Sequence, residues 1–74
     1  MYEIFEILKE LPPRIDQYGN QIWVDVAGHY HRINDKPAII FKNGSKEWYI
    51  HGKLHRDNAK PAIICWNGDC IWYT

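Results

Sequence analysis

Two His-Arg pairs are the residues of this sequence whose types most readily suggest chemistry. His31-Arg32 and His55-Arg56 recur at equivalent places of a repeated segment, and imidazole and guanidinium groups suit proton transfer and anion binding. Residues that recur with a repeated framework are explained most simply by the fold. We therefore expect the His rings to pack beside Trp and the Arg side chains to pair with a cross-strand acid such as Glu47.

Cysteine and histidine could instead form a metal site or a disulfide. Cys65 and Cys70 lack a C-x-x-C spacing, and His51 and His55 are separated by a turn, so we predict no metal site. In the expected hairpin the two cysteines lie opposite each other, at a separation that a disulfide tolerates. Reduced thiols are the preferred interpretation for a cytosolic chain, and a disulfide is the alternative.

The residues needed for most enzyme mechanisms are missing from the pattern. Ser45 is the only serine and Thr74 the only threonine, and neither clustered carboxylates nor a phosphate-binding loop is found. The sequence therefore predicts a protein without catalytic residues or cofactors.

Charge and hydropathy limit the partners and the location. Nine acidic residues balance nine basic ones, whereas nucleic-acid-binding proteins usually carry a basic excess. No apolar run approaches the roughly 20 residues that span a bilayer, and the start of the chain lacks the features of a signal peptide. We expect a cytoplasmic protein that binds neither membranes nor, in the first instance, nucleic acid.

An internal repeat organises the chain. Residues 28–49 and 52–73 are two copies offset by 24 positions, and residues 18–32 form a degenerate half-repeat. The half-repeat has one extra residue between Trp23 and Gly28, which predicts a bulge or a longer turn. A length of 74 residues is typical of one small domain, which we place at 1–74.

The repeated unit is typical of a β-hairpin. Asn43-Gly44 predicts a two-residue turn, and His51-Gly52 predicts a second one. These turns place Phe41 opposite Lys46, Ile39 opposite Trp48, and Trp48 opposite His55. We expect an antiparallel meander of about six or seven strands.

The N-terminal segment, residues 1–13, shows a different pattern. Ile4, Phe5, Leu8 and Leu11 are spaced as on one face of a helix, and Pro12-Pro13 would end it. A helix packed on the sheet makes the predicted fold α+β. A first strand is the alternative for this segment.

The strings WYIHGKLHR and KPAIICWNG, together with HYHRINDKPAIIFKNG, resemble the W-Y-x-x-G-x-x-H-R-x-D-G-P-A repeat of small bacteriophage and giant-virus proteins, which are loosely similar to MORN repeats. The resemblance covers residues 23–73. The linkers Asn34–Lys36 and Asn58–Lys60 are one residue longer than the common Asp-Gly form, and we expect Asn to adopt the left-handed conformation there. The resemblance implies viral origin and a binding scaffold in the host cytoplasm.

A protein-binding module is the leading functional hypothesis, because one short helix cannot cover both apolar faces of such a sheet. With a viral protein, the partner would be a host or viral protein, for example a defence component that is inhibited. Single-stranded nucleic-acid binding through exposed aromatics and a homodimer formed through edge residues 70–74 are the alternatives. The predicted contact residues are Phe41, Lys46, Trp48, Tyr49, His51, Trp66, Trp72 and Tyr73.

Overall fold

The described part of the chain is built from antiparallel strands. The computed structural model describes residues 12–68 and the backbone of residues 71–72, and this part contains no helix. The predicted α+β class is therefore corrected to antiparallel β for these residues. Residues 1–11, where we predicted a helix or alternatively a strand, lie outside the described residues. Residues 12 and 13 carry no regular secondary structure.

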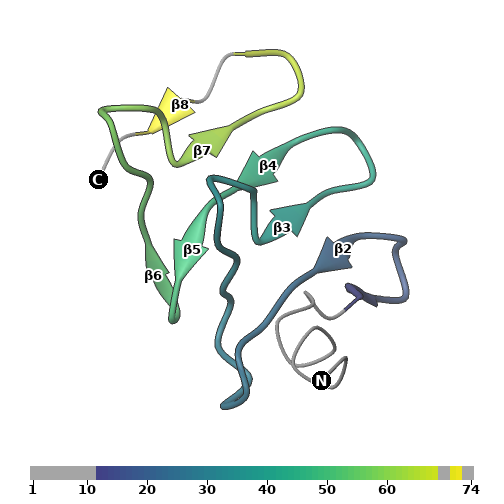
Figure 1. Cartoon of the computed structure of the whole chain (residues 1–74). Coiled ribbons are helices and arrows are strands. Elements are labelled where there is room, and N and C mark those ends of the chain that lie inside the picture. Colours follow the sequence, from purple (N-terminus) through teal and green to yellow (C-terminus); the bar gives the residue numbers. More distant parts are fainter. Residues whose placement is uncertain (1–11, 69–70, 73–74) are drawn as a thin grey trace.

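Within the described residues, eight two-residue strands form two sheets (Figure 1). Six strands pair in the order β1-β2-β3-β4-β7-β8, and β5 pairs with β6 alone. The strands are β1 Arg14–Ile15, β2 Gln21–Ile22, β3 Ile39–Ile40, β4 Lys46–Glu47, β5 Tyr49–Ile50, β6 Lys53–Leu54, β7 Ile63–Ile64 and β8 Ile71–Trp72. The predicted meander is thus confirmed, but it is divided between two sheets.

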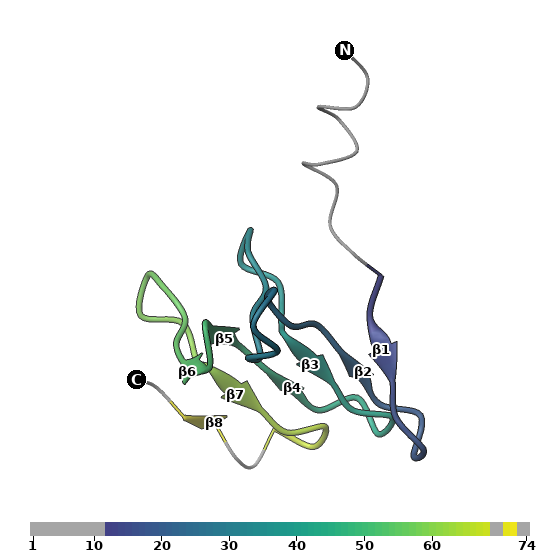
Figure 2. The same ribbon diagram turned by 90° about the horizontal axis from the view of Figure 1, so that it is seen from below.

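Three equivalent turns lie along one edge of the six-stranded sheet, as Figure 2 shows from below. In each turn a glycine N–H donates to the carbonyl three residues earlier: Gly19 to Asp16 (3.1 Å), Gly44 to Phe41 (2.9 Å) and Gly68 to Cys65 (2.8 Å). All three glycines have positive φ, at 86°, 97° and 78°. Only glycine adopts this conformation without steric cost, which explains why it recurs at this position.

The turn after β3 differs from the prediction by one residue. Phe41 N–H donates to Ser45 O, and Ile40 pairs with Lys46, so the loop has three residues instead of two. Of the three loop residues, only Gly44 has positive φ. The Asn43 side chain accepts the Ser45 backbone N–H, and this hydrogen bond stabilises a three-residue turn with a bulge. The predicted pairs Phe41 with Lys46 and Ile39 with Trp48 are therefore wrong, and Ile39 pairs with Glu47.

The second layer consists of two hairpins that extend away from the turn edge (Figure 1). The β5–β6 hairpin turns at His51-Gly52, where φ is 46° and 83°, as predicted for a two-residue turn. The equivalent hairpin, residues 24–30, closes with a Gly28 N–H to Asp25 O bond and an Asp25 N–H to His29 O bond. Its loop is one residue longer, which confirms the longer turn predicted for the half-repeat.

The small core lies where the two layers meet. Its fully or nearly buried residues are Trp23, Ala38, Ile39, Trp48 and Ala62. Equivalent backbone bonds hold both copies: the N–H of Trp23 donates to Ala38 O and that of Trp48 to Ala62 O, each at 2.8 Å. The recurrent Trp and Ala therefore fix the junction between sheet and hairpin in each repeat.

The linkers between the hairpins turn through two consecutive left-handed residues. Asn34 and Asp35 have φ of 64° and 58°, and Asn58 and Ala59 have φ of 64° and 57°. The prediction that Asn adopts this conformation is confirmed at both sites. Ala59 lacks a side chain that could offset the steric cost of positive φ.

Within the part of the chain that the structure describes, no helix is long and apolar enough to cross a membrane.

Candidate functional site

Two clamps made of Trp, Arg and Pro join consecutive repeat units, and they account for the arginines of the His-Arg pairs. The prediction that the histidines pack beside Trp is not confirmed, because His31 binds His51 and His55 binds Asp57. The guanidinium carbon of Arg32 lies 3.5 Å from the ring centroid of Trp23, and Arg32 Nη1 donates to Pro37 O at 3.2 Å. A cation over an indole face is stabilised by the ring quadrupole. The arginine is therefore part of the fold, in agreement with the structural interpretation of these pairs.

The second clamp repeats this geometry. Arg56 lies 3.8 Å from the ring centroid of Trp48, and its Nη1 donates to Pro61 O at 3.1 Å. The predicted pairing of Arg56 with Glu47 is wrong, because Arg56 Nε donates to Asp35 instead, and Glu47 Oε1 accepts the hydroxyl of Tyr49 at 2.8 Å. Burial, followed by this hydrogen bond, raises the pKa of Tyr49 to about 12. The recurring spacing of Trp, Arg and Pro is the sequence signal that could have predicted the clamps.

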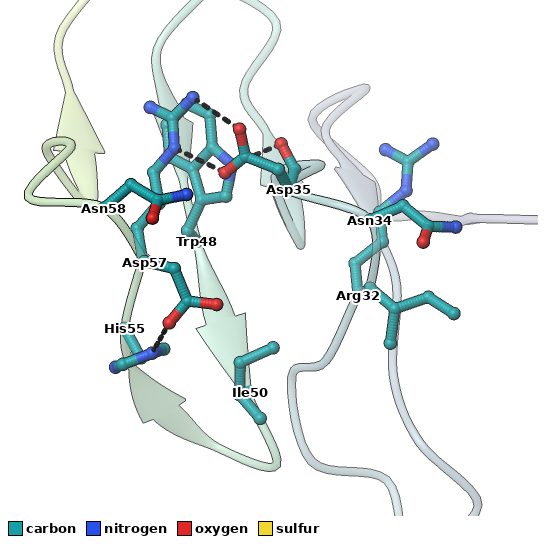
Figure 3. Close-up of a pocket in the computed structure, with 10 residues that line it drawn as sticks. Arg32, Asn34, Asp35, Trp48, Ile50, His55, Asp57 and Asn58 are labelled. Atoms are coloured by element: carbon teal, nitrogen blue, oxygen red, sulfur yellow. Dashed lines mark hydrogen bonds and ion pairs between the residues drawn. The ribbon is translucent and has the colours of Figure 1, made fainter.

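Asp35 links the first linker to the second clamp (Figure 3). Its carboxylate oxygens accept from Arg56 Nε at 2.9 Å and from Lys60 Nζ at 2.8 Å, and its carbonyl accepts from Trp48 Nε1 at 3.0 Å. The hydrogen bonds from Arg56 and then Lys60 lower the pKa of Asp35 from 3.8 to about 2. Asp35 is therefore ionised at neutral pH and ties the two copies together.

A pocket of about 270 Å³ opens between the two linkers, and we call it the inter-repeat groove. Its walls come from residues 32–35 and 55–58, with Trp48 and Ile50 beneath them. In Figure 3 the carboxylate of Asp57 and the side chain of Ile50 both lie below the Trp48 ring, and His55 is bound to Asp57. The groove was not predicted, because it depends on how the linkers fold back on the β5–β6 hairpin.

Trp66 stands at the tip of the β7–β8 hairpin and is 66% exposed. Its backbone is held from the neighbouring turn, because Trp66 N–H donates to Ser45 Oγ at 3.0 Å. The equivalent bond in the preceding repeat runs from Lys42 N–H to Asn20 Oδ1 at 2.8 Å. The indole is thus displayed on a backbone whose position the neighbouring turn fixes.

Cys65, the residue before Trp66, does not have the reduced thiol that we preferred from the sequence. Cys65 is disulfide-bonded and carries no free thiol, so the prediction of reduced cysteines is wrong and the disulfide alternative holds at this position. Its predicted partner, Cys70, lies outside the described residues. The disulfide adds a covalent restraint beside the exposed indole.

A histidine cluster joins the two hairpins of the second layer. The Oδ2 atom of Asp25 lies 2.8 Å from His51 Nδ1 and 3.5 Å from His29 Nδ1. The rings of His31 and His51 stack with centroids 4.0 Å apart. The hydrogen bond with His51 is the main cause that holds the pKa of Asp25 well below its usual range. Among the described residues no group of three side chains is arranged to hold a metal ion.

The predicted contact residues are dispersed over the molecule. Lys46, His51 and Trp66 are exposed, Phe41 and Tyr49 are half-buried, and Trp48 is 6% exposed and lies in the core. Tyr73 and the side chain of Trp72 lie outside what the structure describes. The structure brings His51 to the histidine cluster and leaves Trp66 at the turn edge, so the candidates do not form one patch.

Searches against protein-family models, curated proteins and solved structures find no match to this chain.

Proposed function

We propose that this chain is a small, non-enzymatic protein-binding module whose anchor is Trp66. The observation that carries the proposal is the 66% exposure of an indole on a hairpin tip whose backbone is already bound to Ser45. Tryptophan is enriched among residues that dominate binding energies. A prearranged anchor also loses little conformational entropy when it binds.

Comparison of the repeats supports this assignment. The position of Trp66 is occupied by Lys42 in the first copy, and that of Cys65 by Phe41. The turn itself forms in both copies with the same glycine hydrogen bond. Since the fold does not require an indole or a disulfide at this turn, both are free to serve a partner.

The proposed partner is a protein with an apolar pocket that accepts an indole. Lys42, exposed on the adjacent turn, would lie at the rim and favour an acidic border around that pocket. Following the resemblance to viral repeat proteins, we propose a protein of the host cell as the first source to test.

The experiment is affinity capture from host lysate with three baits of equal folded content, judged by circular dichroism. The baits are the wild type, Trp66→Ala and Val26→Ala; Val26 is fully exposed on the opposite hairpin and serves as the matched control. We expect a protein that the wild type and Val26→Ala enrich and that Trp66→Ala loses at least tenfold. Equal capture by all three baits, or no enrichment over a blank resin, would contradict the proposal.

A second arm tests the nucleic-acid alternative. Mobility of single-stranded DNA and RNA is measured with the wild type and Trp66→Ala at low and moderate salt, because phosphate contacts weaken steeply with salt. A shift at low salt that Trp66→Ala abolishes would transfer the role of the indole from protein binding to base stacking.

A further inference from the structure

The histidine cluster contains the Asp25 carboxylate, the His29 and His51 imidazoles beside it, and the His31 ring stacked on His51. Asp25 Oδ1 accepts the backbone N–H groups of Ala27 and His29, each at 2.9 Å, and Oδ2 accepts from His51 Nδ1. The Asp25 side chain is only 10% exposed, whereas those of His29 and His51 are 62% and 66% exposed. One carboxylate is therefore already fully engaged while two of its imidazole neighbours remain open to solvent.

The contact between the hairpins depends on an unprotonated nitrogen. The backbone N–H of His51 donates to His31 Nδ1 at 3.0 Å. Nδ1 of His31 must therefore carry a lone pair, and in the neutral ring the proton is on Nε2. The stacked ring of His51 lies 4.0 Å from that of His31. The hydrogen bond and the stack together join residues 29–31 to the turn of the β5–β6 hairpin.

We propose that His31, His51 and Asp25 form a pH-sensitive latch that holds the 24–30 hairpin against the β5–β6 hairpin and loosens in mildly acidic solution. The latch is independent of Trp66, which lies at the other edge of the molecule, and so it goes beyond the proposed binding function.

The direction of the pH effect follows from the hydrogen bond to His31 and from the charges on the histidine rings. Imidazole in peptides titrates near pH 6.5. Protonation of His31 at Nδ1 turns the acceptor into a donor that faces the N–H of His51, and the hydrogen bond is lost. The stacked imidazolium rings of His31 and His51 would then repel each other, with centroids 4.0 Å apart. Protonated His51 also pairs more strongly with Asp25, but its ring is 66% exposed, so solvent and salt keep this opposing gain small. The open state accepts these protons without that repulsion, so a falling pH favours opening.

The other titratable side chains near this junction are two tyrosines, a carboxylate and a lysine. The rings of Tyr30 and Tyr49 lie with centroids 5.1 Å apart and are tilted by 59°, and the hydroxyl of Tyr49 donates to the Glu47 carboxylate. Lys53 belongs to β6 and pairs with Ile50. Two backbone bonds, Arg32 N–H to Tyr49 O and Gly52 N–H to Tyr30 O, also cross the junction and contain no titratable group.

Opening of the latch would alter the inter-repeat groove. Ile50, next to His51, forms part of the groove, and Arg32, next to His31, forms its opposite wall. Looser contact between the two hairpins therefore allows the walls of the groove to separate.

The test is NMR measurement of amide exchange on the full chain between pH 7.5 and 5.0 in the presence of EDTA. Protection is corrected for the intrinsic pH dependence of exchange, and the amides of His51 and Gly52 are compared. His31→Asn keeps a side-chain acceptor that does not titrate. His55→Asn is the matched control, because His55 is the equivalent residue of the second copy and binds Asp57 instead.

In the wild type and in His55→Asn we expect protection of the His51 amide to fall about tenfold as pH decreases, while His31→Asn shows no such decrease. A wild-type His51 amide with constant protection, or an equal decrease in His31→Asn, would overturn the proposal. If His31→Asn does not fold, the side-chain ¹⁵N shifts of wild-type His31 decide the matter: an unprotonated Nδ1 at pH 7.5 supports the latch, and a protonated Nδ1 refutes it.

Discussion

The two Trp-Arg-Pro clamps have nearly the same geometry although they join different pairs of repeat units. The cation lies 3.5 Å from the indole centroid in the first clamp and 3.8 Å in the second. The Arg-to-Pro carbonyl distances are 3.2 and 3.1 Å. Such agreement indicates that the recurrent residues carry the fold of each unit.

The copies differ at positions that the clamps do not use. Asp35 in the first linker corresponds to Ala59 in the second, Lys42 in the first turn to Trp66, and His29 to Lys53. Asp35 binds the next repeat, Trp66 is exposed, and His29 belongs to the histidine cluster. The recurrent residues therefore hold the fold, whereas the ion pairs and the histidine cluster that join the units come from residues that do not recur.

Removing a clamp tryptophan should have the largest effect. We expect Trp48→Ala to lower the free energy of unfolding by about 3–5 kcal/mol, because the indole is 6% exposed and leaves a cavity. In a domain of this size that loss is comparable with the whole stability. Urea unfolding followed by far-UV circular dichroism measures it, and a loss below about 1 kcal/mol would remove the clamps from the core.

Removing a clamp arginine should have an intermediate effect. Arg56→Ala is expected to cost about 1–3 kcal/mol, through the lost indole contact and the lost bond to Pro61 O. Lys60→Ala is the matched control, because Lys60 binds the same Asp35 carboxylate from a more exposed position. It should cost about 0–1 kcal/mol in the same assay. Equal costs would show that charge, and not the clamp, stabilises this region.

The link through Asp35 gives a pH dependence with a definite sign. Its pKa is lowered from 3.8 to about 2 in the folded state, so its contribution is present above pH 4 and is lost as the pH falls from 4 to 2. Asp35→Asn should therefore be less stable than the wild type at pH 6. The gap should narrow towards pH 2 in urea titrations at each pH, and a gap that stays constant would contradict the ion pairs.

The strained linker predicts a small gain in stability. Ala59 has φ of 57°, and glycine relieves the left-handed strain while adding entropy to the unfolded chain. We expect Ala59→Gly to stabilise the protein by about 0.5–1 kcal/mol. Asp35→Gly at the equivalent site should instead destabilise it, since the ion pairs are lost. Thermal unfolding of both variants separates strain from ion pairing.

Local sequence signals predicted those features that depend on a single turn. The left-handed Asn34 and Asn58, the two-residue turn at His51-Gly52 and the longer turn after Asp25 all follow from nearby residues. The register after Ile40 was not predictable in this way. There the choice between two turn types depends on whether the Asn43 side chain bonds to Ser45.

Features that join distant segments were beyond the sequence patterns. The second sheet forms because the chain leaves the first one at Trp48, where the indole binds Asp35 O from the preceding linker. The inter-repeat groove and the histidine cluster also depend on how the linkers and hairpins of the second sheet fold back on one another. The histidine cluster, for example, brings His29 and His51 together around Asp25 although they belong to different hairpins.

The recurrent tryptophans Trp23 and Trp48 hold the fold, whereas Trp66 does not. The most direct test is the free energy of unfolding of Trp66→Ala relative to the wild type, measured by urea titration under the conditions used for Trp48→Ala. We predict a difference within about 0.5 kcal/mol, as for other exposed substitutions. A loss above about 2 kcal/mol would contradict the account, because it would place Trp66 among the residues that the fold requires.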